Sequence, residues 1–172
     1  MTLFKPGHKP PHVTMPARVF FGSKNSIFRG PATAANAAAL RQALPWLAPT
    51  TFGLATSAGC GDRIGLCTPG HAAAFIEVGG LRPVFAQQSI REMGRTHRTP
   101  TNVLDDAMWG AFKAGWTDGF GADADHLKTL EDIDACADAG YRIFTFDPGF
   151  LVDGEAHDAD FATCLAKAEA LD

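Results

Sequence analysis

The sequence predicts an α/β fold, a partial (β/α)8 barrel of the TIM type with about four βα units. From residue 50 onward, short apolar runs alternate with longer segments of helical period. Successive strands start roughly 25 to 35 residues apart, as the crossovers of a parallel sheet require. A polar cluster follows each strand. Such clusters meet at one rim of a barrel, whereas a doubly wound sheet gathers its polar groups near a switch point.

The predicted strands are four short apolar runs. They comprise residues 51–56, 82–86, 119–122 and 142–146. Between them we expect three helices. The first covers residues 69–78, with Thr68 as its N-cap, and the third covers residues 130–139 before Gly140. The second begins near Thr99-Pro100 and ends near Gly115. A fourth helical segment, residues 159–171, reaches the end of the chain.

The segment before residue 50 looks different, and we divide the chain there. Residues 1–49 form a basic N-terminal arm and a lead-in segment, and residues 50–172 form the first half of a barrel. Prolines make Met1 to Pro16 an extended arm, and an Ala-rich helix over residues 31–47 should end near Pro45.

Charge and cysteine content narrow the possible partners and compartments. The first 61 residues contain six Lys or Arg and no Asp or Glu, so they carry +6, and the rest must sum to -10 to give the net charge of -4. We expect the basic arm to fold against the acidic body, and no nucleic-acid partner. No apolar run approaches the roughly 20 residues of a membrane span. The four cysteines match no zinc or disulfide pattern, which indicates a cytoplasmic protein.

The length is short for a barrel. Eight βα units need about 250 residues, so we expect a chain truncated at its C-terminal side. A half barrel leaves two strand edges unpaired. The missing C-terminal half or a second copy of the chain would cover them.

Asp123, Asp125, His126 and Lys128 form the densest reactive cluster. Residues 123 and 125 of a strand share one face, but a strand end can release this alternation, so Asp125 and His126 could both reach a site. Imidazole and carboxylate suit a divalent cation, and a carboxylate can act as a general base. The alternative is a structural role, in which Asp123 caps a turn and His126 bonds within its loop.

The ends of the first two strands supply candidate substrate-binding residues. Arg63 could hold a carboxylate in a bidentate fork beside Asp62, in a glycine-rich loop that lets a ligand approach the backbone. Gln87 and Gln88 could donate to substrate hydroxyls. Alternatively, Asp62 and Arg63 belong to local salt bridges, and the two glutamines satisfy loop backbone.

Several motifs, in this order and spacing, closely resemble the tagaturonate epimerase family. They are residues 61–66 (GDRIGL), 68–71 (TPGH), 85–92 (FAQQSIRE), 104–110 (LDDAMWG) and 119–128 (GFGADADHLK). The resemblance implies a barrel enzyme that interconverts two keto-uronates, tagaturonate and fructuronate, in hexuronate breakdown and uses a divalent metal cation. It also implies that Asp125 is the proton acceptor and His126 a metal ligand. The family's proton donor and other metal-binding histidines would lie beyond Asp172.

Two other functions are compatible with the same residues. One is a metal-dependent sugar isomerase or aldolase on the same barrel, which would share the metal and differ in substrate. The other is a half barrel without catalysis, kept as an interaction or assembly fragment.

Overall fold

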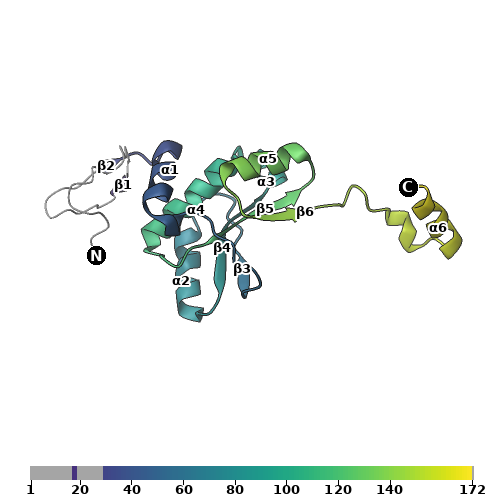
Figure 1. Cartoon of the computed structure of the whole chain (residues 1–172), viewed down its shortest axis with the longest axis horizontal. Helices are drawn as coiled ribbons and strands as arrows, with labels where there is room; N and C mark the ends of the chain where they lie inside the picture. Colours follow the sequence, from purple (N-terminus) through teal and green to yellow (C-terminus); the bar gives the residue numbers. More distant parts are fainter. Residues whose placement is uncertain (1–16, 19–28, 172) are drawn as a thin grey trace.

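The computed structural model describes residues 17–18 and 29–171 of the chain. A parallel sheet forms its centre, and its four strands lie in chain order, β3-β4-β5-β6. The strands are β3 (Ser57–Gly59), β4 (Arg82–Ser89), β5 (Gly121–Leu127) and β6 (Ile143–Phe146). The sheet curves from β3 round to β6 (Figure 1). Sequential parallel strands joined through helices form a curled half barrel, so the predicted fold class is confirmed.

Strand positions differ from the prediction in two places. The strand predicted over residues 51–56 is wrong, because a turn lies there and β3 starts at Ser57. The strand predicted over residues 119–122 begins later and continues to Leu127, so the polar cluster lies within β5. Similarly, β4 continues through Gln87 and Gln88 to Ser89. The polar residues therefore belong to the C-terminal ends of β4 and β5 and not to the loops that follow.

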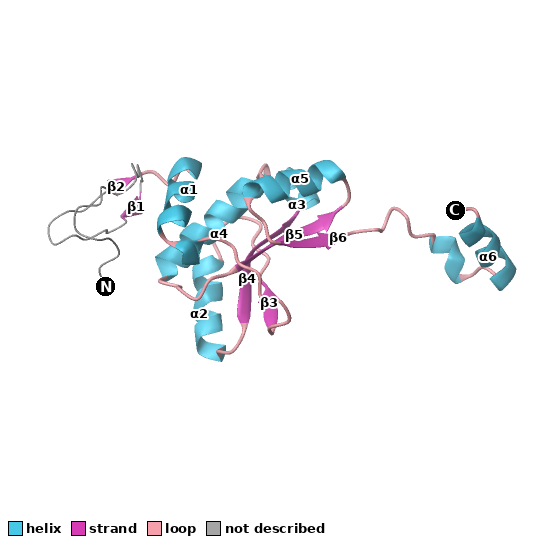
Figure 2. Ribbon diagram, viewed as in Figure 1, coloured by secondary structure: helices cyan, strands magenta, loops and turns pink. Residues whose placement is uncertain are grey.

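Helices fill each crossover and lie mainly on one side of the sheet (Figure 2). They are α2 (Thr68–Val78), α3 (Ile90–Thr96), α4 (Pro100–Ala114) and α5 (Leu130–Ala139). The predicted ends of α4 are confirmed: Thr99 is the N-cap before Pro100, and Gly115 ends the helix with φ 69°. Thr99 also forms a capping box with Asn102, which was not predicted. The N-cap predicted for α2 is wrong, since Cys67 occupies that position and Thr68 is buried in the helix. Helix α3 is additional to the prediction.

The core lies between the sheet and helices α2 and α4. Phe85 of β4 packs edge-on against Phe75 of α2 and against Trp116, with ring centroids 5.9 and 5.6 Å apart. The indole N–H of Trp116 donates to the carbonyl of Gly119 at 2.7 Å. Aromatic packing of this kind fixes α2 against β4.

The remaining elements lie at the two ends of the chain. They are β1 (Ala17–Arg18), β2 (Arg29–Gly30), α1 (Ala34–Ala43), the 3-10 helices η1 (Pro45–Leu47) and η2 (Gly154–His157), and α6 (Phe161–Glu169). Arg41 of α1 pairs with Asp105 of α4 at 2.6 Å, which is one contact between the basic segment and the acidic body. The predicted arm, Met1 to Pro16, lies outside the described residues, and the boundary at residue 49 stays a prediction. None of the described helices is both long and apolar enough to span a bilayer.

Candidate functional site

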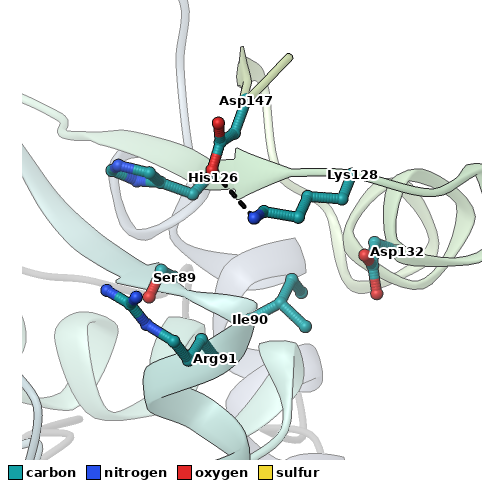
Figure 3. Close-up of a pocket in the computed structure, with 7 residues that line it drawn as sticks. All are labelled: Ser89, Ile90, Arg91, His126, Lys128, Asp132 and Asp147. Atoms are coloured by element: carbon teal, nitrogen blue, oxygen red, sulfur yellow. Dashed lines mark ion pairs between the residues drawn. The ribbon is translucent and has the colours of Figure 1, made fainter. Parts of the chain in front are cut away.

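The C-terminal ends of β4, β5 and β6 meet at one edge of the half barrel and enclose a pocket of about 250 Å³. Seven residues line it: Ser89, Ile90, Arg91, His126, Lys128, Asp132 and Asp147 (Figure 3). Active sites of β/α barrels occupy this edge, because the loops after the strands converge there. The pocket is therefore the candidate functional site.

A bulge near the end of β5 turns two reactive side chains away from the helices. Residues 124 and 127 of β5 pair with residues 144 and 146 of β6, so β5 contains one extra residue. His126 has φ 56°, in the left-handed region that residues other than glycine seldom adopt. Ala124 and Leu127 remain buried, while Asp125 and His126 reach the rim. The bulge thus releases the alternation of the strand.

Asp125 and His126 contact each other directly. His126 Nδ1 lies 2.8 Å from Asp125 Oδ1, and the side chains are 57% and 20% exposed. A carboxylate at Nδ1 fixes the imidazole ring and leaves Nε2 as the nitrogen that can bind a cation or accept a proton. Within residues 29–171, the His126 ring is the one side chain that pairs with the Asp125 carboxylate, so its second oxygen stays available.

Lys128 and Asp147 form an ion pair in the same pocket. Lys128 Nζ lies 3.2 Å from Asp147 Oδ2, and Figure 3 shows the lysine reaching toward this carboxylate. The backbone N–H of Gly149 also donates to Asp147, at 2.9 Å. The Gly149 N–H, followed by the Lys128 ammonium, lowers the pKa of Asp147 below its ordinary value. Asp147 therefore stays ionised beside the ammonium group.

Asp123 does not cap a turn, the structural alternative considered from the sequence, but lies in a polar row one layer below the rim. Asp123 accepts from Gln87 Nε2 and from Thr145 Oγ1, both at 2.9 Å, and so joins β4, β5 and β6. A side chain at Gly59 would collide with Gln87. The glycine therefore leaves room for the glutamine on this face of the sheet. The alternation of Asp123 with Asp125 indicated the face, but no sequence signal identified Thr145 as a partner. Gln87 lies on the same face as Asp123, and its substrate-binding role stays a prediction.

Gln88 points to the other face of β4, toward the helices. Its side chain is 1% exposed, accepts from Arg98 Nη1 at 2.6 Å and donates to Thr96 at 3.0 Å. The same guanidinium donates to Asp106 at 2.7 Å and to the carbonyl of Asp62 at 2.9 Å. Both ends of Gln88 are thus occupied in a buried network. Because adjacent strand residues face opposite sides, Gln87 and Gln88 cannot serve one ligand together.

The Asp62 carboxylate organises its own loop, residues 60–67. It accepts from the backbone N–H groups of Ile64, Gly65 and Cys67 at 3.2, 2.9 and 2.7 Å, and the residue is 6% exposed. Burial raises the pKa of Asp62, but the backbone N–H donors lower it further, so the net pKa lies below the ordinary value. The geometry gives Asp62 a structural role, and substrate binding by this residue stays a prediction.

Arg63 lies on the surface and is paired. Its Nε donates to Glu92 Oε1 at 2.6 Å, and its side chain is 63% exposed. Of the six residues predicted for the site, His126 lines the pocket, and Asp125 contacts His126. Asp62, Arg63 and Gln88 make their contacts elsewhere. No group of three His, Cys, Asp or Glu side chains suited to a metal ion occurs among the residues that the structure describes.

Comparisons with known proteins identify the family of the chain. A family model described as tagaturonate epimerase matches residues 16–172. The tagaturonate/fructuronate epimerase of Thermotoga maritima is 51% identical over 113 residues, which is 66% of this chain and 23% of that protein.

Solved structures of a fructuronate-tagaturonate epimerase from Cohnella laeviribosi match as well. The native crystal structure has a TM-score of 0.79 and 34% identity, over 88% of this chain and 31% of that chain. The complex with one glycerol has a TM-score of 0.78 and 34% identity, over 86% and 30% of the two chains. The chain therefore spans a third or less of the length of these relatives. Since the family model matches nearly all of it, the chain belongs to the tagaturonate epimerase family.

Proposed function

We propose that this chain supplies the first strands of an epimerase that interconverts D-tagaturonate and D-fructuronate in hexuronate breakdown. The observation that supports this most strongly is the Asp125 and His126 pair, 2.8 Å apart at the rim of β5, in a member of the tagaturonate epimerase family. A carboxylate beside an imidazole at the end of a barrel strand is suited to proton transfer on a sugar. Four free cysteines agree with a reducing compartment, and we expect the protein in the cytoplasm.

The substrates constrain the chemistry. The two keto acids differ at a carbinol carbon β to the ketone, so removal of an α-proton cannot invert that centre. We propose that Asp125 takes the hydroxyl proton from this carbon. The bond between the α and β carbons then breaks, its electron pair forms an enediolate, and the β carbon becomes an aldehyde. Rotation of the aldehyde and re-addition to its other face, with the proton returned, give the epimer.

His126 fits as one ligand of a divalent cation. Its Nδ1 faces Asp125, so Nε2 is the nitrogen that would bind the ion. Since the described residues hold no group of three donors, the other ligands would come from outside residues 29–171. A cation there would act as a Lewis acid that stabilises the negative charge developing on the substrate. Asp125 would then both orient the ring through Oδ1 and offer its other oxygen as the base.

A chimera tests the proposal. Residues 16–172 of this chain would replace the matching segment of the Thermotoga maritima relative, and interconversion would be assayed with D-tagaturonate, D-tagatose and D-tagatose 6-phosphate. We expect turnover of the keto-uronate only. Turnover of the phosphorylated ketose instead would favour the isomerase or aldolase alternative. Trapping no aldehyde intermediate, while detecting transient oxidation at the carbinol, would contradict the retro-aldol route.

A further inference from the structure

Arg91 combines two properties: it lines the pocket, and it has no carboxylate partner among the described residues, whereas Arg82, Arg95 and Arg142 also lack one but do not line this pocket. Arg41, Arg63 and Arg98 each pair with a carboxylate, those of Asp105, Glu92 and Asp106 respectively. Figure 3 shows its guanidinium beside Ser89, on the β4 side of the pocket. A guanidinium presents a planar fork of donors that matches a carboxylate in bidentate fashion.

The other charged groups of the pocket leave this fork available. Asp147 is occupied by Lys128 and by the Gly149 N–H. Asp132 lies in the first turn of α5, on the far side of the pocket from Arg91 in Figure 3, where the helix dipole favours a negative charge. Lys128 is 52% exposed, and its ammonium has three donors, of which Asp147 needs one. Asp147 is thus paired, Asp132 lies across the pocket at a helix N-terminus, and the donors of Arg91 and Lys128 remain for a ligand.

We propose that Arg91 and Lys128 form the subsite for the carboxylate of the keto-uronate. This rests on the proposed function, which supplies a substrate with a carboxylate at one end. Ser89 and His126 line the same pocket, and His126 contacts Asp125. A sugar acid held by its carboxylate at Arg91 would therefore extend toward the Asp125 and His126 pair.

The subsite gives these two residues a role in specificity. A neutral ketose lacks the anion, so it would leave the Arg91 fork unpaired and lose the charge-assisted hydrogen bonds. Arg63, the earlier candidate for this role, already pairs with Glu92 on the surface. The substrate carboxylate would thus bind at the ends of β4 and β5, one strand away from the loop that contains Arg63.

Arg95 provides a matched control. It lies on the same short helix, four residues after Arg91, is exposed, and does not line the pocket. Titrations of the ¹⁵N-labelled chain with D-tagaturonate and with D-tagatose would be followed by NMR for the unmodified chain and for Arg91→Gln, Arg91→Lys, Lys128→Gln and Arg95→Gln.

We expect Arg91→Gln to raise the Kd for D-tagaturonate at least about tenfold, because hydrogen bonds to a charged group are lost. Lys128→Gln and Arg91→Lys should cause smaller increases. Binding of D-tagatose should change less than about twofold in every variant, and Arg95→Gln should match the unmodified chain. Since Arg91 and Arg95 are both exposed, their variants should keep the dispersed amide spectrum of the fold.

Two results would overturn the subsite in distinguishable ways. If the chain prefers D-tagaturonate to D-tagatose but Arg91→Gln and Lys128→Gln bind it as tightly as Arg95→Gln does, the subsite is wrong and the epimerase proposal stands. If the unmodified chain shows no saturable response to D-tagaturonate, or binds both sugars equally, the subsite is wrong, and the proposed function fails as well only if the chimera does not turn over D-tagaturonate.

Discussion

The loop at residues 60–67 and the end of β5 offer similar residues to the same edge of the sheet, and the molecule uses them in opposite ways. Asp62 accepts three backbone hydrogen bonds from its own loop and is almost fully buried. Within the described part of the chain, Asp125 accepts none of this kind; its Oδ1 lies 2.8 Å from Nδ1 of His126, and the side chain keeps contact with solvent. Arg63 pairs with Glu92, whereas His126 lines a pocket.

The difference lies in where the hydrogen-bonding capacity of each group goes. A carboxylate that satisfies three amides has little left for a ligand, and its removal would leave those amides unpaired in a buried loop. A carboxylate held by a single imidazole retains an oxygen for proton transfer. The two aspartates should therefore respond oppositely to mutation, one through stability and the other through activity.

The largest expected effect is on activity at the end of β5. In the chimera, Asp125→Asn should lower kcat by about a hundredfold or more, because general base catalysis is lost. The variant should unfold at the same denaturant concentration as the parent. Asp62→Asn in the same chimera provides the contrast, with kcat within a few fold of the parent. Similar losses from both substitutions would show that the two regions do not differ as described.

The next effect is on stability in the loop. Asp62→Ala should reduce the free energy of unfolding of the chain by roughly 2–4 kcal/mol, since several buried N–H groups lose their acceptor. Urea unfolding followed by circular dichroism measures it. Asp134→Ala, an exposed aspartate on α5, serves as the control and should change stability by less than about 0.5 kcal/mol. A loss below about 1 kcal/mol for Asp62→Ala would contradict the role of the carboxylate in the loop.

The pH dependence of stability should differ in sign between two buried aspartates, because the pKa of Asp62 is lowered and that of Asp105 is raised. The pKa of Asp62 is lowered by loop amides despite burial, so its contribution is present above the unfolded pKa, about 3.9, and is lost as pH falls through the lower folded pKa. The pKa of Asp105 is raised, mainly by burial, so that residue favours the folded state more as pH falls.

Urea unfolding at several pH values from about 3 to 6 tests this difference. Asp62→Asn should flatten the loss of stability toward low pH, and Asp105→Asn should steepen it. Equal slopes in both variants and the unmodified chain would rule out these shifts.

The smallest expected effect is that of breaking the exposed ion pair between Arg63 and Glu92. Arg63→Gln should change the free energy of unfolding by less than about 1 kcal/mol, because an exposed ion pair contributes little. It should also leave the Kd for D-tagaturonate within about twofold, as the carboxylate is assigned to Arg91. A tenfold weaker affinity would instead restore Arg63 as the carboxylate clamp.

Local signals in the sequence were sufficient for most helices. Thr99 and Gly115 mark the two ends of α4, and Gly140 marks the end of α5, because a cap depends on a few adjacent residues. The strand β3 was misplaced because its position depends on pairing with β4, in which Ser57 lies opposite Arg82. Helix α3 was missed because it has only seven residues and its N-cap, Ser89, resembled part of a reactive cluster.

The site was only partly predictable for a similar reason. The face of a strand can be deduced from alternation, which separates Gln87 from Gln88, but the partners of each side chain come from distant segments. Gln88 is occupied by Arg98, and Asp123 is held by Thr145 of the next strand. The bulge at His126 depends on the register between β5 and β6, which no local pattern of residues 119–128 specifies.

An NMR titration of the ¹⁵N-labelled chain with D-tagaturonate tests most directly whether the end of β5, and not the loop at residues 60–67, is the binding site. We expect the largest shift changes at the amides of Ser89, Arg91, Asp125, His126 and Lys128, with little change at Asp62 and Gly65. Shift changes centred on residues 60–67, with those of Asp125 and His126 unaffected, would contradict the assignment.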